Sequence, residues 1–195
     1  CYEVCPAQAI AIKDDDFEAF RRYPHSVALL PAVFMGQFPD GISVSQVYAT
    51  LYELGFAHVM EVESAAMIYK EAKEKYAHEH PDTKPWISSF CPAIVRLIQI
   101  KYPSLAENIM PIKVPLDLSP MYALEELLSR GIPRDEIGLF YITPCAAKVS
   151  AVKAPVGEER SIIDGVINMN SLYNRVYKRI KDNGKNHQYK PLRSE

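Results

Sequence analysis

Two stretches of this sequence place a cysteine between a β-prone run and the start of a helix. In the first, residues 86–87 suit a pleated, buried surface, and Cys91 is followed by Pro92, which suits a first helical turn. In the second, the apolar run 137–142 leads directly to Cys145. Ligands of open α/β sheets bind at the carboxyl ends of the strands. The sequence therefore predicts one site that contains both cysteines.

A thiol at the amino end of a helix has distinctive chemistry. The helix end carries partial positive charge, which favours the thiolate over the thiol. A thiolate in that position can ligate a soft metal or attack an electrophile, and a buried core cysteine is the third interpretation. Two cysteines in matched settings favour a shared site over two unrelated core residues.

Strand patterns alternate with helix patterns along the chain, which predicts the α/β class. We expect parallel βαβ units that form two small doubly wound lobes, divided near residues 102–109. Ser43 and Gln46 form a capping-box pattern, and Gly55 and Gly131 are expected to end helices. The expected strands cover residues 27–30, 59–62, 86–87, 109–114, 137–142 and 162–169. The expected helices cover residues 43–54, 64–80, 92–102, 121–130, 146–152 and 170–181.

Composition narrows the functional classes. The 195 residues are 48% hydrophobic, which is enough for one or two domains with a real core. A net charge of −2 and a pI near 6.3 imply no nucleic-acid partner. No apolar run approaches the ~20 residues of a membrane span, and four dispersed cysteines are not typical of a disulfide framework. We therefore expect a cytoplasmic protein.

The first residues carry a second cysteine pattern. Cys1 and Cys5 are separated by three residues, and a proline follows the second, which resembles the end of the bacterial ferredoxin run C-x2-C-x2-C-x3-C-P. We expect residues 1–13 to be the tail of a ferredoxin-like 4Fe-4S domain and residues 14–26 to be a linker. Because the first two cysteines of the run are absent, we do not expect that cluster to form in this fragment.

The two cysteine motifs resemble those of the catalytic domain of iron-only (di-iron) hydrogenases. Residues 88–92, Ser-Ser-Phe-Cys-Pro, are similar to the family's T-S-C-C-P-x-W motif. Residues 143–148, Thr-Pro-Cys-Ala-Ala-Lys, are similar to its M-P-C-x-x-K motif. Smaller blocks at residues 31–33, 54–56 and 118–121 stand at the intervals that this family has. The resemblance implies that residues 27–195 are a partial hydrogenase-like domain that lacks its C-terminal cluster motif.

The resemblance also implies a set of ligands and a partner. Cys91 and Cys145 would ligate the 4Fe-4S part of a di-iron H-cluster-like centre. Lys148 would donate a charge-assisted hydrogen bond to a cyanide of the di-iron subsite. The electron partner would be a carrier such as ferredoxin or an adjacent Fe–S domain. The residues that would line the pocket of the di-iron subsite are Pro31, Ala32, Ser89, Pro120 and Met121.

Departures from the family motifs change the expected activity. Phe90 stands where catalytic members carry a second cysteine that passes protons to the di-iron site, and phenylalanine has no exchangeable proton. Thr143 and Ile94 replace a methionine and a tryptophan, and the third cluster motif does not occur before Glu195. We therefore expect a divergent member that senses redox state or hydrogen with weak or no turnover. The H-cluster-like centre is expected in the intact protein and not in this fragment.

Three other functions fit the same residues. The chain could belong to an authentic ferredoxin-linked hydrogenase in which ordered water or Ser89 carries the proton. It could be an enzyme with Cys91 as nucleophile, although no histidine is near either cysteine in the sequence. It could also be a non-catalytic interaction domain that keeps the fold without the site.

Overall fold

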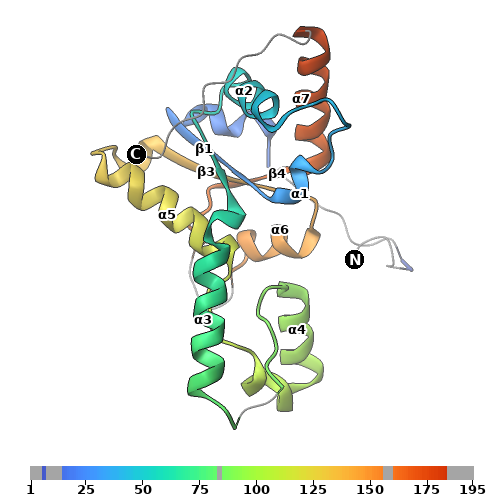
Figure 1. Ribbon diagram of the computed structural model, residues 1–195, viewed down its shortest axis with the longest axis vertical. Coiled ribbons are helices and arrows are strands. Elements are labelled where there is room, and N and C mark those ends of the chain that lie inside the picture. The colour runs from blue at the N-terminus through green and yellow to red at the C-terminus, as the bar shows by residue number, and fades with distance from the viewer. Residues whose placement is uncertain (1–5, 8–14, 83–84, 156–159, 184–195) are drawn as a thin grey trace.

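The centre of the molecule is one sheet of four parallel strands. The computed structural model describes residues 6–7, 15–82, 85–155 and 160–183. The strands are β1 (His25–Leu30), β2 (His58–Glu61), β3 (Ile137–Thr143) and β4 (Gly165–Asn168), in the order β2-β1-β3-β4 (Figure 1). Every pairing is parallel. The predicted α/β class with parallel βαβ units is confirmed.

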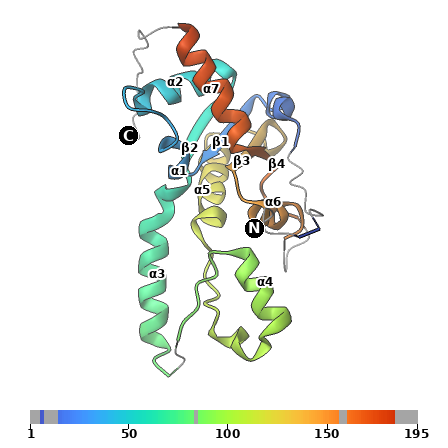
Figure 2. The same ribbon diagram turned by 90° about the vertical axis from the view of Figure 1, so that its right-hand side faces the viewer.

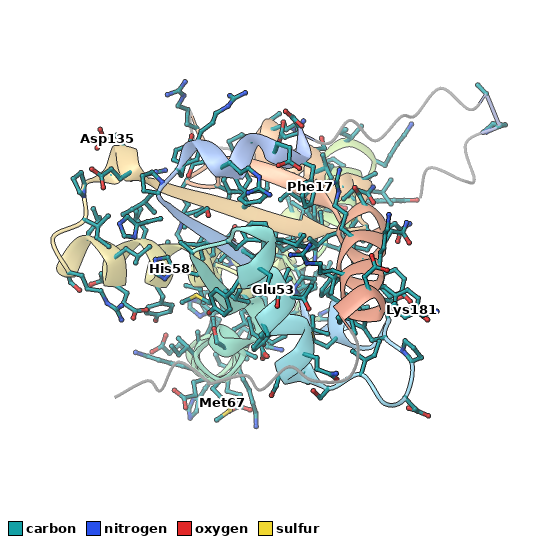
Figure 3. The ribbon with its side chains drawn as sticks, turned by 90° about the horizontal axis from the view of Figure 1, so that it is seen from above. Phe17, Glu53, His58, Met67, Asp135 and Lys181 are labelled. Carbon is teal, nitrogen blue, oxygen red and sulfur yellow. The ribbon has the colours of Figure 1, made fainter. Side chains whose placement is uncertain are left out.

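Alternating side chains of β1 and β3 face two separate cores. Ala28 and Leu30 belong to the core under α2 (Val44–Leu54), α7 (Met169–Asn183) and the 3-10 helix Phe17–Arg22. Val27 and Leu29 belong to the core under α5 (Pro115–Ser129). This two-residue period is the one that a strand buried on both faces requires. Figure 3 shows the helices on the two sides of the sheet.

A helical arm extends away from the sheet. It contains α3 (Ala66–Glu79) and α4 (Pro92–Lys101), which lie below the sheet in Figures 1 and 2. No α3 residue is fully buried. The arm's extended segments meet at one isolated parallel bridge, Ile87 to Ile109. Where the sequence predicted a second doubly wound lobe, the described residues form this arm, and the chain returns from it at α5.

The predicted helix ends are largely confirmed. Ser43 caps α2, and its side chain and that of Gln46 form the reciprocal capping box. Gly55 follows with a φ of 108°, and Gly131 follows α5 with a φ of 82°. These left-handed conformations favour glycine because a Cβ atom strains them.

Several boundaries differ from the predicted ones, each for a local reason. Residues 109–114 form no strand beyond the single bridge, since Pro111 has no N–H to donate to a ladder. Helix α5 begins at Pro115, so Ser119 lies inside it and does not cap it. At α7, Asn168 accepts hydrogen bonds from the N–H groups of Asn170 and Ser171, so Asn168 is the cap. The two remaining α-helices of the described residues are α1 (Ala32–Met35) and α6 (Ala146–Lys153), and the other 3-10 helices are Val62–Ala65, Pro103–Asn108 and Arg134–Glu136.

Two histidines meet at the amino-terminal edge of the sheet. His25 and His58 are the first residues of β1 and β2, and His25 Nδ1 lies 3.3 Å from His58 Nε2. His58 stands beside α5, whose Glu126 and Arg130 form an ion pair (Figure 3). Burial, followed by the charges of His25 and Arg130, lowers the pKa of His58, while Glu126 acts in the opposite direction.

We expect Ser119→Ala to destabilise the fold. Ser119 is fully buried, and its Oγ donates to the Val62 carbonyl at 2.6 Å, which joins α5 to the end of β2. The substitution leaves that carbonyl without its donor and should lower the free energy of unfolding by about 1–3 kcal/mol in urea denaturation. Ser129→Ala, whose exposed hydroxyl bonds within its own helix, is the control and should change it by under about 0.5 kcal/mol. Equal losses in the two variants would contradict this assignment.

We expect the histidine pair to make stability depend on pH. A folded-state pKa below the unfolded value of about 6.5 means that the neutral form stabilises the fold above that pH. The contribution is lost as pH falls from 6.5 through the lower folded pKa. Urea denaturation at pH 7.5, 6.5 and 5.5 should show a steeper loss in the unaltered protein than in His58→Gln, with at most about 1.4 kcal/mol per pH unit from this proton. Parallel pH profiles would rule the effect out.

Candidate functional site

Cys145 lies where the sequence placed it. It follows β3 and occupies the N-cap position of α6, with an extended backbone and a half-buried side chain. Its N–H donates to Thr143 Oγ1 at 3.1 Å. The loop is thus fixed by a hydroxyl two residues earlier, and the thiol stands at the positive end of a helix.

Cys91 is also an N-cap residue, but its setting differs from the predicted one. It precedes Pro92 at the start of α4, as expected, and its side chain is half-buried. It does not follow a strand of the sheet, because residues 86–87 form only the bridge to Ile109. Side-chain hydrogen bonds hold this segment instead: Ser88 Oγ lies 2.9 Å from Tyr69 Oη, and Ser89 Oγ donates to the Ile112 carbonyl at 3.0 Å.

Lys148 joins the two cysteine motifs. It lies in the first turn of α6, and its Nζ is 4.8 Å from the centre of the Phe90 ring, next to Cys91 in the chain. The same Nζ donates to Tyr141 Oη at 3.3 Å. Lys148 thus brings the first turn of α6 into contact with the residue before Cys91, although Cys91 and Cys145 are 54 positions apart in the sequence.

Tyr141 is the buried member of this cluster. Its side chain is 1% exposed on β3. Burial raises its pKa, while the charge and hydrogen bond of Lys148 and a hydrogen bond with Thr143 act in the opposite direction. At neutral pH the phenol is protonated, so it can accept from the ammonium without adding negative charge.

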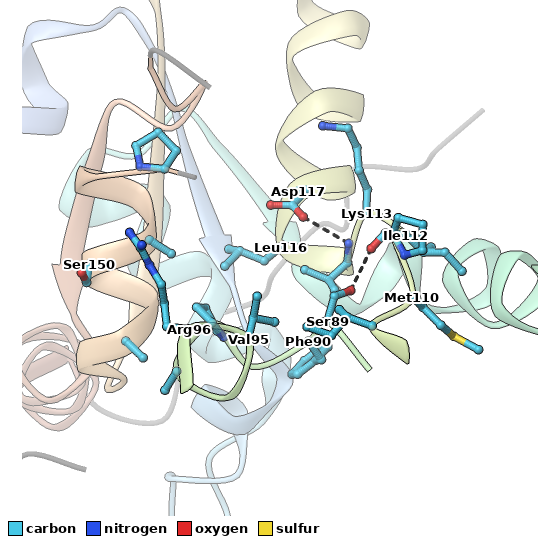
Figure 4. A pocket seen from close by; sticks show the side chains of 18 of the residues that line it. Ser89, Phe90, Val95, Arg96, Met110, Ile112, Lys113, Leu116, Asp117 and Ser150 are labelled. Carbon is cyan, nitrogen blue, oxygen red and sulfur yellow. Dashed lines mark hydrogen bonds between the residues drawn. The ribbon is translucent and has the colours of Figure 1, made fainter. Parts of the chain in front are cut away.

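A cavity of about 500 Å³ opens beside the first motif (Figure 4). Its walls are α4, the segment 109–117 and α6. Ser89 and Phe90 form one side, and Arg96 lies between α4 and α6 in the close view. Of the sequence-predicted lining residues, Ser89 borders this cavity, whereas Pro31, Ala32, Pro120 and Met121 do not.

Those four residues lie elsewhere around the sheet and α5. Pro31 and Ala32 follow β1 at the carboxyl edge, and the Ala32 N–H donates to Glu63 Oε2 at 2.7 Å. Pro120 is buried inside α5, and Met121, the next residue, is 43% exposed. Because β1 and β3 are parallel neighbours, Ala32 and Cys145 share one edge.

The described residues fit part of an iron–sulfur ligand set. Cys91 and Cys145 are free thiols at helix N-termini, and Lys148 could supply positive charge beside an anionic cluster. Across the described ranges, no group of three or more His, Cys, Asp or Glu side chains is arranged to hold a metal ion. Cys1 and Cys5 lie outside the described residues. Of a set of four cysteine ligands, this part of the chain could offer Cys91 and Cys145.

Tyr141, Tyr69 and Glu63 are site residues that sequence reasoning missed. Tyr141 sits in an apolar strand and Tyr69 in a helical stripe, patterns that indicate core packing rather than a site. A polar hydroxyl in an otherwise apolar buried strand was the one available signal, since a buried phenol needs a partner.

The described helices include none long and apolar enough to cross a membrane.

Comparisons with known proteins identify the family and similar folds. Residues 25–183 match the family described as iron only hydrogenase large subunit, C-terminal domain. Among solved structures, an FeFe-hydrogenase that reveals stepwise assembly of the H-cluster is 22% identical, with a TM-score of 0.64 over 86% of this chain and 45% of the other. Two FeFe-hydrogenases from Chlamydomonas reinhardtii, an apo cysteine-to-histidine variant and a glutamate-to-alanine variant, each have 22% identity and a TM-score of 0.63.

The fraction of each chain that is covered determines what these matches establish. The two algal structures cover 86% and 85% of this chain, and it covers 46% and 44% of them. The chain thus spans less than half the length of these solved structures, and at this identity they establish the fold. The family match spans most of the chain, and by it the chain belongs to the C-terminal-domain family of the iron-only hydrogenase large subunit.

Proposed function

We propose that this chain is the hydrogenase-like part of an iron–sulfur protein that senses redox state or hydrogen, with weak or no turnover. The observation that carries the proposal is Phe90. It occupies the position beside Cys91 where the family motif has a second cysteine, and its ring packs against the Lys148 ammonium.

The chemistry of Phe90 separates electron transfer from proton transfer. A cluster bound through thiolates can gain and lose electrons whatever the neighbouring side chain is. Hydrogen evolution also needs a proton delivered to the reacting metal, and phenylalanine cannot donate or accept one. Its ring is 45% exposed, so it covers part of the site with apolar surface.

Different residues of the site would bind different parts of the implied cofactor. Cys91 and Cys145, at the N-termini of α4 and α6, would ligate a 4Fe-4S cluster. Lys148 would donate to an anionic ligand of the di-iron part. The cofactor, when bound, would supply reversible one-electron chemistry and a site for hydrogen. A ferredoxin-type carrier or an adjacent Fe–S domain, to which Cys1 and Cys5 would belong, would exchange the electrons in a cytoplasmic setting.

A second candidate is an authentic hydrogenase with another proton route. Ser89 favours it, because this hydroxyl borders the cavity and adjoins Phe90. Its proton is donated to the Ile112 carbonyl at 3.0 Å, so relay through it requires that bond to break first. Hydrogen uptake linked to methyl viologen by the intact, cluster-loaded protein distinguishes this candidate from a sensor.

The remaining candidates receive less support. A cysteine nucleophile needs a base, and His25 and His58 lie at the amino edge of the sheet, opposite the edge that Cys145 follows. His78 and His80 are exposed at the far end of α3. A non-catalytic interaction domain predicts partner binding that survives loss of both Cys91 and Cys145.

We expect Cys91→Ser and Cys145→Ser each to lower cluster loading severalfold. The intact protein is reconstituted anaerobically, and bound iron and the charge-transfer absorbance of the cluster are measured. A serine hydroxyl is a much poorer ligand for iron in such a cluster than a thiolate. Ser45→Ala, on exposed α2 surface, is the handling control and should load normally. Background iron in the unaltered protein with both thiols intact would overturn the proposed function.

We expect Phe90→Cys alone to leave hydrogen evolution near the rate of the unaltered protein. The variant adds a sulfhydryl but also removes the ring that contacts Lys148, and Thr143 still departs from the family motif. Hydrogen is measured with reduced methyl viologen after loading to equal iron. Evolution at least tenfold faster than in the unaltered protein would show that the missing relay was the only barrier, which contradicts a sensory site.

A further inference from the structure

The Lys148 side chain is half-buried and is held without a carboxylate. Within the described part of the chain, no acidic side chain forms an ion pair with it. Its contacts are the Tyr141 hydroxyl at 3.3 Å, the Phe90 ring at 4.8 Å and the Tyr141 ring at 5.9 Å. A lysine ammonium that is partly withdrawn from water is often paired with a carboxylate, whereas the contacts of Lys148 are two aromatic side chains.

The two partners come from opposite sides of the site. Tyr141 belongs to the central strand β3 and is fixed by the core, whereas Phe90 belongs to the arm and is partly exposed. Both contacts leave the full positive charge on Lys148, because neither partner is an anion. A carboxylate in the same place would cancel that charge.

A continuous set of contacts links Lys148 to both cysteine loops. The Cys145 N–H bonds to Thr143, which lies two residues beyond Tyr141 on β3, and Tyr141 accepts from Lys148. Lys148 then contacts Phe90, next to Cys91. The hydroxyl of Tyr141 is the point where this chain of contacts passes from the sheet to the ammonium.

We propose that Tyr141 is a positioning residue that, together with the Phe90 ring, holds the Lys148 ammonium uncancelled between the two cysteine loops, ready for an anionic ligand. The inference rests on the proposed function for the identity of that ligand. The positioning itself is a property of this chain's residues and can be measured without any cofactor.

The test is the reactivity of Lys148 in the intact protein before cluster loading. The protein is treated with limiting acetic anhydride, and acetylation of each lysine is followed by mass spectrometry. Lys153, which lies on the same helix and pairs with Asp15, is the internal reference. We expect Tyr141→Phe to raise Lys148 acetylation about three- to tenfold relative to Lys153, because the nitrogen loses its acceptor.

A second test variant and a control variant complete the acetylation experiment. Phe90→Leu retains apolar volume but removes the ring quadrupole, and it should raise Lys148 acetylation about two- to fivefold. This variant applies even if Tyr141→Phe does not fold, since Phe90 is partly exposed. Tyr122→Phe, on the exposed face of α5, is the matched control and should leave the ratio unchanged.

The acetylation results distinguish positioning of Lys148 from structural damage, and a separate iron measurement tests the proposed function. A selective rise at Lys148 supports the inference. A ratio unchanged in both Tyr141→Phe and Phe90→Leu overturns it, and so does an equal rise at Lys148 and Lys153, which would mean that α6 has loosened. Iron content after loading is measured separately, so a protein that binds no iron fails the proposed function while the acetylation ratio still decides the role of Tyr141.

Discussion

The parallel pairing of β1 with β3 is the constraint on which the site depends. Its register sets Leu29 opposite Tyr141, so both strands end at the same edge. The segments that follow them, from Ala32 and from Cys145, must then leave the sheet side by side. Side chains on both faces of these strands are buried, which makes a slip of register costly. The position of the second cysteine motif is thus fixed by the core.

The first cysteine motif has no such support, and its position depends on long-range polar contacts. The chain leaves the sheet after β2, runs out along α3 and returns at α5. The Ser119 bond to the Val62 carbonyl fixes the return, and the bond from Ser89 to the Ile112 carbonyl fixes the segment before Cys91. Contacts of this kind join residues 57 and 23 positions apart. The arm is accordingly the part of the site where a small change in geometry moves Phe90 relative to Lys148.

Sequence patterns correctly predicted the helix ends and strands that depend on interactions between residues close in the chain. The capping box at Ser43, the positive-φ glycine at Gly55 and the strand before Cys145 depend on neighbours within a few residues. The two helices of the arm were predicted as well. Its extended segment was not, since residues 86–87 have β-prone side chains but find only one bridge partner. Tyr141 was not predicted as a site residue for a related reason. A tyrosine inside an apolar strand has the pattern of a core residue until its partner on a helix is known.

The proposed sensory function depends on two features of this site, the Lys148 ammonium and the Phe90 ring beside it. Under the proposed function, the Lys148 ammonium, whose contacts are Phe90 and Tyr141, would stabilise an electron-rich centre held by the two cysteines. The group that touches this ammonium from the arm is a hydrocarbon ring, which cannot pass a proton onward. A centre that is stabilised when reduced but poorly supplied with protons accumulates the reduced state rather than discharging it as hydrogen. That is the behaviour a redox reporter needs, and under the proposed function it would result from Phe90 together with the other departures from the family motif, such as Thr143.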